Sequence, residues 1–169
     1  VMHAQQAIES LLALAARGEQ ISVQNVNYII SLVREGQQDK LDQMGKGVIC
    51  VTVRGKPVKA KTLGQQSYID ANKMAIMGWS YGGYQSLMTM STKGHPYKAC
   101  VAIAPVTDWK LYDSAYTERY MRTPQENGDG YAINPIQRAK NLHGNLLLIH
   151  GTADDNVHYR NCTEVAEAY

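Results

Sequence analysis

The chain has 169 residues, a net charge of +2 and a hydrophobic content of 44%, which is enough for one ordinary globular core. Its basic and acidic residues are interspersed, so no concentrated charge favours a nucleic acid or an anionic membrane as a partner. No apolar run approaches the roughly 20 residues of a membrane span, and no secretory leader is evident. Three widely spaced cysteines, Cys50, Cys100 and Cys162, indicate free thiols rather than a disulfide framework or metal site. No metal or cofactor is expected.

Two amphipathic helices are predicted in the first part of the chain. Apolar residues recur at helical spacing in residues 5–17, and Gly18 is a suitable C-terminal cap. Ser22 is a suitable N-terminal cap for a second helix of the same period, which Gly36 ends. The two helices are expected to pack on each other.

The pattern then changes to β-structure. Residues 47–62, GVICVTVRGKPVKAKT, predict a β-hairpin, and a short helix is expected from Gln65 to Ala71. After Asp70 come three short apolar runs, MAIMGW, KACVAIAP and NLLLIHG, separated by helical or loop segments. Such runs are typical of strands buried on both faces of a parallel sheet. The sequence therefore predicts a small helical unit with a hairpin, followed by an α/β unit.

The stretch GWSYGGY contains a G-x-S-x-G pattern made by Gly78, Ser80 and Gly82, with Gly83 added. An apolar strand precedes it and an apolar helix follows, which is the context of a nucleophile elbow and disfavours a chance match. Small residues let this turn close, so that the serine hydroxyl projects over the C-terminal edge of the sheet. Backbone N–H groups at the helix start, including that of Tyr81, would stabilise a developing oxyanion. Ser80 is the predicted nucleophile.

A serine nucleophile needs a base and an acid that orients the base. In α/β-hydrolases the chain order is serine, acid, histidine. Asp154 and Asp155 lie in the loop after the last predicted strand. Adjacent acids in a loop are more often solvated surface groups, but the upstream elbow favours a catalytic role here. Only His158 follows them, too close in sequence to bridge to Ser80, so it is predicted to be a surface or packing residue. The sequence offers a nucleophile and an acid without an evident base.

Three separated stretches, GWSYGGY, APVTDWKLYDSAYTERYMRTPQENGDGY and LLLIHGTADDNVH, carry a family resemblance. Over residues 70–169 the chain resembles the catalytic domain of dipeptidyl-peptidase IV-like serine peptidases, in the prolyl oligopeptidase family. The resemblance implies a partial α/β-hydrolase fold with Ser80 as nucleophile and Asp154 as triad acid. It also implies a peptide substrate that is cleaved after proline or alanine through an acyl-enzyme.

The same resemblance implies a set of substrate-binding residues. The S1 pocket would be lined by Tyr81, Val106, Trp109, Tyr112, Tyr116 and Val157, and Asn156 would hydrogen-bond the carbonyl of the substrate residue before the scissile bond. From spacing alone, the three aromatic residues from 109 to 116 would form one face of a helix, a pattern more typical of a core. Their binding role therefore depends on the resemblance.

Parts of the family pattern are missing. The family's catalytic histidine would fall beyond Tyr169, and its β-propeller and early hydrolase strands have no counterpart in the sequence. Because the loss of triad members leaves only residual catalysis, the chain alone is expected to be nearly inactive. Both ends suggest a fragment.

The first seventy residues resemble the segment that precedes the P-loop in PhoH-like ATPases, mostly through RGKPVKAKTLGQ. A Gly-Lys-Ser/Thr loop should follow to bind phosphates, but the next glycine turn, GWSYGG, has no lysine. The predicted domains are therefore 1–70, PhoH-like without its P-loop, and 71–169, a partial peptidase. The alternatives are a nucleotide- or RNA-associated module and a non-catalytic chimera joined near LGQQSYIDANK. The two resemblances imply different compartments, so localisation stays open.

Overall fold

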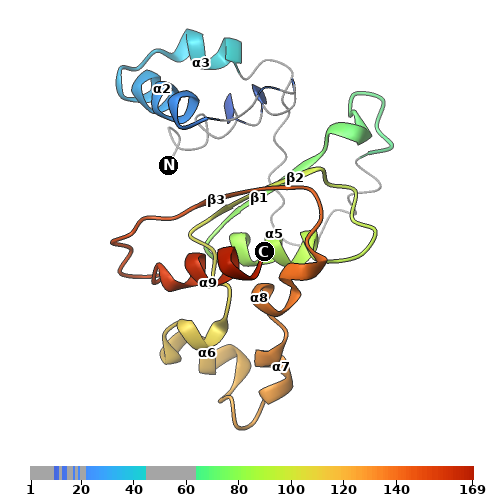
Figure 1. Ribbon diagram of the computed structural model, residues 1–169, viewed down its shortest axis with the longest axis vertical. Coiled ribbons are helices and arrows are strands. Elements are labelled where there is room, and N and C mark those ends of the chain that lie inside the picture. The colour runs from blue at the N-terminus through green and yellow to red at the C-terminus, as the bar shows by residue number, and fades with distance from the viewer. Residues whose placement is uncertain (1–9, 12, 15–16, 18, 20–21, 45–63) are drawn as a thin grey trace. The chain divides into compact units, whose positions relative to one another are not determined.

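The computed structural model describes residues 10–11, 13–14, 17, 19, 22–44 and 64–169 (Figure 1). The chain divides into two compact units, Val1–Val58 and Lys59–Tyr169, which are treated separately below. The hairpin expected at residues 47–62 lies outside the described residues, and the domain boundary expected after residue 70 stays a prediction.

The first unit contains the predicted capped helix. Helix α2 spans Val23–Arg34, and the Ser22 side chain accepts the Asn25 N–H while the Asn25 side chain accepts the Ser22 N–H. After the helix Gly36 has φ +67°, the left-handed conformation that glycine adopts easily. A further helix that the sequence did not predict, α3, spans Gln38–Met44. Of the predicted helix at 5–17, the described residues 10–11 and 13–14 are helical.

The second unit is built on a three-stranded parallel sheet in the order β1-β2-β3, at Ala75–Trp79, Ala99–Ile103 and Asn145–Ile149. The three predicted strands are thus confirmed, and so is their parallel arrangement. The last residues of the strands, Trp79, Ile103 and Ile149, lie in one row of the register. The segments that follow all three strands therefore leave from the same edge of the sheet.

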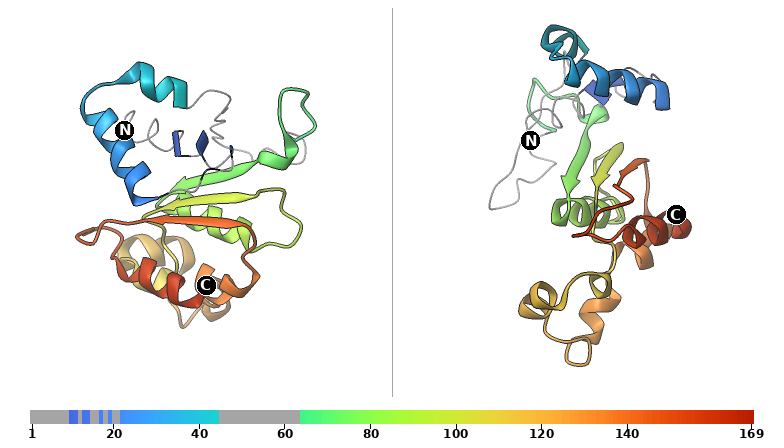
Figure 2. Two further views of the ribbon diagram at one scale, coloured as in Figure 1. Left: turned by 45° about the horizontal axis from the view of Figure 1, so that its top comes forward. Right: turned by 90° about the vertical axis from the view of Figure 1, so that its left-hand side faces the viewer.

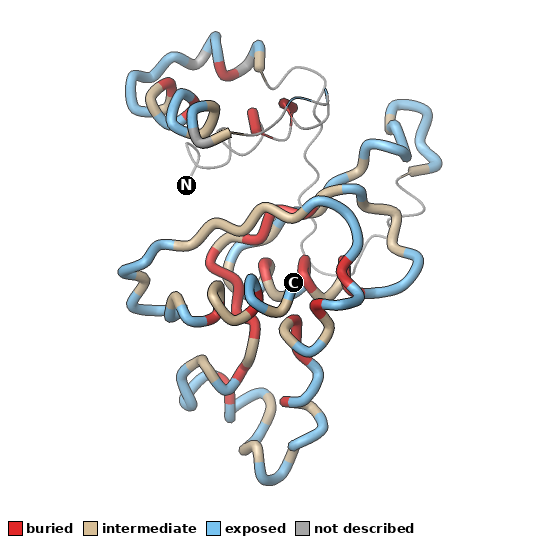
Figure 3. The backbone as a smooth tube through the Cα atoms, in the orientation of Figure 1, coloured by how far each residue is buried: buried red, intermediate tan, exposed pale blue. Residues whose placement is uncertain are grey.

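The prediction that all three strands are buried on both faces is wrong for the outer two. Residues Cys100, Val101 and Ala102 of β2 are buried, whereas β1 alternates between exposed and half-buried residues (Figure 3). Met77 is 37% exposed and Trp79 58% exposed. Apolar runs of this kind are typical of central strands, but β1 and β3 are the outer strands of the described sheet.

Helix α5, Tyr81–Met90, connects β1 to β2 and packs against both strands. In both figures α5, α8 (Pro135–Arg138) and α9 (Arg160–Ala168) lie on the same side of the sheet (Figures 1 and 2). Leu87 and Met90 of α5 form the core there with Cys100 and Ala102 of β2. This packing fixes the helix start, and with it the turn at Ser80, relative to the strands.

Short helical elements fill the connection from β2 to β3. They are η2 (Trp109–Leu111), α6 (Ser114–Met121), α7 (Gly128–Ala132), α8 and η3 (Ala139–Asn141).

The helix predicted from Gln65 to Ala71 is wrong. Turns are found there instead, followed by the 3-10 helix η1, Ala71–Lys73. The reason is local: the Asp70 side chain accepts the Asn72 N–H and starts the short helix at that point.

Candidate active site

Ser80 occupies a strained turn between β1 and α5. Its backbone angles are φ 54° and ψ −115°, a region that non-glycine residues rarely adopt. The turn is held on both sides, because the Ser80 N–H donates to the Ile103 carbonyl at 2.9 Å and the Ser80 carbonyl accepts the Tyr84 N–H at 3.0 Å. The sequence motif therefore forms the sharp strand-to-helix turn of a nucleophile elbow.

The glycines around Ser80 have different roles in this turn. A Cβ atom at Gly78 would lie 2.0 Å from the Gly82 carbonyl oxygen, and one at Gly83 would lie 2.9 Å from the Pro105 side chain. A Cβ at Gly82 would meet nothing within 4 Å. The close approach of two backbone segments therefore requires glycine at 78 and 83, while Gly82 contributes only its own backbone.

The start of α5 provides donors beside the serine. Tyr81 is the first residue of the helix, so its N–H is one of those at a helix start without a partner inside the helix. The Ser80 side chain makes no capping hydrogen bond to this helix. A hydroxyl next to free N–H groups at a helix N-terminus is the arrangement that an oxyanion intermediate requires.

Asp154 lies in the loop that follows β3, at the same edge of the sheet. Its Oδ1 accepts the N–H groups of Asn156 at 3.1 Å and Val157 at 3.0 Å, which fixes the carboxylate to its own loop. Asp155, by contrast, is exposed. The two adjacent acids thus have different environments, and Asp154 is the one that is anchored.

Asp154 has a side-chain contact with a histidine that the sequence analysis did not predict. His150, the residue directly after β3, lies with Nε2 3.5 Å from Asp154 Oδ2 and 2.7 Å from the Val157 carbonyl oxygen. His150 and Asp154 are four residues apart in the sequence, but this spacing alone does not show which way the His150 ring points.

The two histidines beside the acid loop, His150 and His158, have partners other than the predicted nucleophile. His158 is exposed and its Nδ1 accepts the Arg160 N–H at 3.1 Å, which agrees with the predicted surface role. His150 follows β3, two strand spacings or about 10 Å from the end of β1. In this part of the chain no hydrogen bond joins a histidine to Ser80 Oγ.

The predicted S1 residues gather around Trp109. Its ring lies 6.0 Å from Tyr81, 6.1 Å from Tyr112 and 6.0 Å from Tyr116, and its side chain shares a buried cluster with Val106 and Val157. All six predicted residues therefore meet, although they come from three separate segments. Tyr84, 5.1 Å from Trp109, belongs to the same cluster and was not predicted.

The expectation that the aromatic residues form one face of a single helix is wrong. Trp109 belongs to η2, whereas Tyr116 belongs to α6. Each element begins after an aspartate cap. Asp108 caps η2, and Asp113 accepts the Tyr116 N–H at 2.8 Å at the start of α6. Burial raises the pKa of the Tyr116 hydroxyl, with further contributions from the neighbouring tyrosine hydroxyls.

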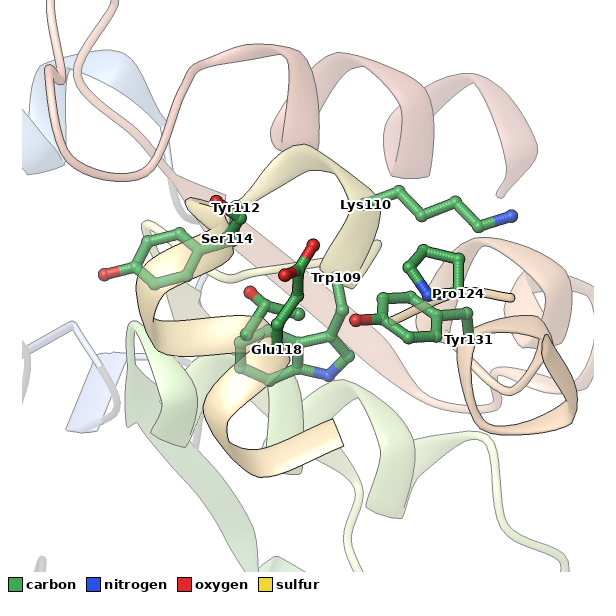
Figure 4. Close-up of a pocket in the computed structure, with 8 residues that line it drawn as sticks. Trp109, Lys110, Tyr112, Ser114, Glu118, Pro124 and Tyr131 are labelled. Atoms are coloured by element: carbon green, nitrogen blue, oxygen red, sulfur yellow. The ribbon is translucent and has the colours of Figure 1, made fainter. Parts of the chain in front are cut away.

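Tyr112 links the aromatic cluster to the acid loop, since its hydroxyl lies 2.8 Å from Asn156 Oδ1. Trp109 also lines a pocket of about 150 Å³ (Figure 4). Its lining is Trp109, Lys110, Tyr112, Ser114, Thr117, Glu118, Pro124 and Tyr131. It shares two residues with the predicted S1 set, but its lining includes neither Ser80 nor Asp154.

A buried amide joins the segment after β2 to the start of α9. Asn161 Oδ1 accepts the Thr107 N–H at 2.9 Å, and the Thr107 hydroxyl donates to the Asn161 carbonyl at 2.7 Å. Both residues are fully buried. Thr107 follows Val106 directly, so this bridge holds the segment after β2 against the start of α9.

Among the described residues, no three His, Cys, Asp or Glu side chains are grouped so that they could hold a metal ion. No helix in that part of the chain has the length and apolar character needed to cross a membrane.

Comparison with known proteins gives a consistent result. A model of the prolyl oligopeptidase family matches residues 58–169. A protein named "Probable dipeptidyl-aminopeptidase B" from Sordaria macrospora is 43% identical over 152 residues, covering 73% of the chain and 16% of that protein. A protein of the same name from Ajellomyces dermatitidis is 51% identical over 105 residues, covering 60% of the chain and 12% of that protein.

Among solved structures, the crystal structure of Porphyromonas gingivalis dipeptidyl peptidase 4 is similar. It is 50% identical with a TM-score of 0.63, over 64% of this chain and 16% of that one. The chain thus spans a small part of the length of its relatives. With the parallel sheet and the elbow, this likeness identifies the second unit as a partial α/β-hydrolase fold.

Nothing in these similarities points to a PhoH-like segment. The family match begins at residue 58, and the Sordaria protein aligns with 73% of the chain, more than residues 70–169 alone make up. The predicted junction near residue 70 therefore gains no support and stays a hypothesis. The family model matches residues 58–169, well over half of the chain, and the chain therefore belongs to the prolyl oligopeptidase family.

Proposed function

We propose that the chain carries the nucleophile and the acid of a serine peptidase of the dipeptidyl-peptidase IV type. The observation that carries the proposal is the strained turn at Ser80, φ 54°, at the same sheet edge as the anchored carboxylate of Asp154. The Ser80 side chain is half-buried and makes no capping bond to the helix that follows it. Backbone strain of about 1–3 kcal/mol persists where a site uses it.

In the proposed reaction Ser80 Oγ attacks the carbonyl carbon of the scissile peptide bond. The N–H of Tyr81 donates to the oxyanion that forms, and the resulting acyl-enzyme is released by water. Asp154 orients a histidine base, for which no described histidine is placed beside Ser80 by a hydrogen bond. The base takes the serine proton and returns it to the leaving amine.

Substrate selection in the proposal depends on the aromatic cluster. Trp109, Tyr112 and Tyr116 offer flat apolar surfaces to a proline or alanine side chain. Tyr112 lies 2.8 Å from Asn156 Oδ1, and with the tyrosine hydroxyl as donor the Asn156 NH₂ group is left to donate to a substrate carbonyl. The names of the relatives support dipeptide release from a peptide substrate.

A fluorophosphonate probe tests the nucleophile directly. We expect slow labelling of the chain at Ser80, because no base is evident beside it, with loss of labelling in Ser80→Ala and no effect of Ser67→Ala, which removes an exposed serine. Absence of labelling on folded wild-type chain would instead support the non-catalytic alternative. Turnover of dipeptidyl nitroanilides is expected to be small for the chain alone, and to favour proline and alanine over glycine.

The competing proposal, a PhoH-like nucleotide- or RNA-associated module, is tested by titration with ATP. We expect no binding heat, because the sequence contains no Gly-Lys-Ser/Thr loop to hold phosphates.

A further inference from the structure

The ring of His150 is enclosed and oriented. Its side chain has no exposed surface, and the Tyr159 ring lies at right angles to it with centroids 5.6 Å apart. Nε2 is 2.7 Å from the Val157 carbonyl oxygen. Since a carbonyl can only accept, Nε2 carries a hydrogen, and in a neutral ring Nδ1 is then the bare nitrogen. Nδ1 is buried without a partner among the described residues.

His150, Asp154 and Val157 form a closed set of contacts. The Val157 N–H donates to Asp154 Oδ1 at 3.0 Å, while the Val157 carbonyl accepts from His150. The same Nε2 lies 3.5 Å from Asp154 Oδ2. The imidazole therefore lies beside Oδ2 and is hydrogen-bonded to the residue whose N–H holds Oδ1.

The two oxygens of Asp154 have different surroundings as a result. Oδ1 accepts two backbone N–H groups, from Asn156 and Val157. Oδ2 faces the buried ring of His150, and the Asp154 side chain as a whole is 23% exposed. A triad acid must present one oxygen to the N–H of the base, and Oδ2, which accepts no backbone N–H among the described residues, is the oxygen left for that role.

We propose that His150 is a positioning residue for Asp154: its Nε2–H, placed between the Val157 carbonyl and Oδ2, fixes the rotation of the carboxylate so that Oδ2 faces the triad base. This inference rests on the proposed role of Asp154 as the triad acid. His150 touches neither substrate nor nucleophile in this arrangement and acts only through the acid.

A purely space-filling role makes a different prediction from positioning. Leucine could fill the same buried volume, but it would leave the Val157 carbonyl without a donor. Glutamine could place an N–H donor near the position of Nε2. The pair His150→Gln and His150→Leu therefore separates hydrogen bonding from packing.

NMR on the full chain labelled with ¹⁵N-histidine tests the contact. We expect long-range ¹⁵N–¹H spectra to show His150 as the Nε2–H tautomer, assigned by its loss in His150→Gln. We expect Asp154→Asn to shift the Nε2 and its proton, and Asp155→Asn, which changes the exposed neighbouring acid, to leave both unchanged. A hydrogen on Nδ1, or equal responses to the two substitutions, would overturn the proposal.

The carboxylate itself gives a second measurement. With ¹³C-labelled aspartate, the Asp154 side-chain carbon should shift in His150→Leu and keep its position in His150→Gln, while Asp155 stays unchanged in both. Equal shifts in the two variants would show that packing alone matters. If His150→Leu does not fold, the Asp154→Asn and tautomer results still decide the matter. Neither measurement depends on Ser80 labelling, so failure of the proposed function is distinguishable from failure of this inference.

Discussion

Substitution of Gly78 by alanine should open the elbow, whereas the same substitution at Gly82 should not. The new methyl at 78 would lie 2.0 Å from the Gly82 carbonyl oxygen and 2.1 Å from its carbon, far inside van der Waals contact. Both neighbours are backbone, so strand β1 or helix α5 must move. Overpacking of this kind lowers the free energy of unfolding by about 3 kcal/mol or more. At Gly82 nothing lies within 4 Å, and the better helix propensity of alanine should add up to about 1 kcal/mol.

Urea unfolding followed by tryptophan fluorescence measures this difference. Trp79 and Trp109 are the two tryptophans of the chain, and both lie in the second unit, so the signal reports that unit alone. With m about 1–3 kcal/mol per M, a loss of about 3 kcal/mol moves the midpoint down by roughly 1–3 M. The reasoning is refuted if Gly78→Ala unfolds within about 0.5 kcal/mol of wild type, or if Gly82→Ala is the more damaging substitution.

Three further predictions concern the strained serine, the buried amide and the thiols. Ser80→Gly should be about 1 kcal/mol more stable than Ser80→Ala in the same urea assay, because only glycine adopts φ 54° without strain, and equal stabilities would contradict the strain argument. Asn161→Ala should lower the free energy of unfolding by about 2–3 kcal/mol, because it leaves the buried Thr107 N–H without an acceptor; the exposed Asn141→Ala is the control, and matching effects would exclude a special role for the bridge. Burial raises the pKa of the Cys100 thiol to about 12 and also raises that of the half-buried Cys162. At pH 8 both thiols of the folded chain should therefore be mostly protonated, and iodoacetamide should modify Cys100 more slowly than Cys162. Peptide mapping by mass spectrometry measures the two rates, which should become similar in urea; equal rates in the folded chain would show that Cys100 is accessible.

The elements that the sequence predicted well depend on short-range patterns. Ser22, α2 and Gly36 form a capped helix within a single stretch, and all of its signals are local. The elbow is also local, since Gly78, Ser80 and Gly83 lie within six residues. Helix α3 was missed because QDKLDQM carries few apolar residues, and of these Leu41 is buried, so no amphipathic period marks it.

The sequence could not show which strands lie at the edge of the sheet. An apolar run such as MAIMGW predicts a strand, but its burial depends on neighbours that the run itself does not specify. The same limit explains the aromatic residues. Helical spacing predicts Trp109 and Tyr116 on one face of one helix. In the structure they lie in two separate elements, η2 and α6, each of which begins after an aspartate cap.

Contacts between distant segments were beyond any local pattern. Thr107 and Asn161 are 54 residues apart in the chain, and neither is unusual for a loop or a helix start. The contact of His150 with Asp154 spans only four residues, but its existence depends on how the chain turns after β3. Residues that hold a site in place are therefore harder to predict from one sequence than the residues that perform chemistry.

The three segments of the candidate site leave the sheet at one edge and are held by several contacts. They leave β1, β2 and β3 from a single row of the register, Trp79, Ile103 and Ile149. The first is held by the elbow glycines, the second by the Thr107–Asn161 bridge and the third by the contacts of Asp154. Because Asn161 lies in α9, the Thr107–Asn161 bridge joins the second segment to the third, so Asn161→Ala should displace both and leave the elbow in place. A change in the packing of β2, the central strand, should displace all three, because each segment takes its position from the register.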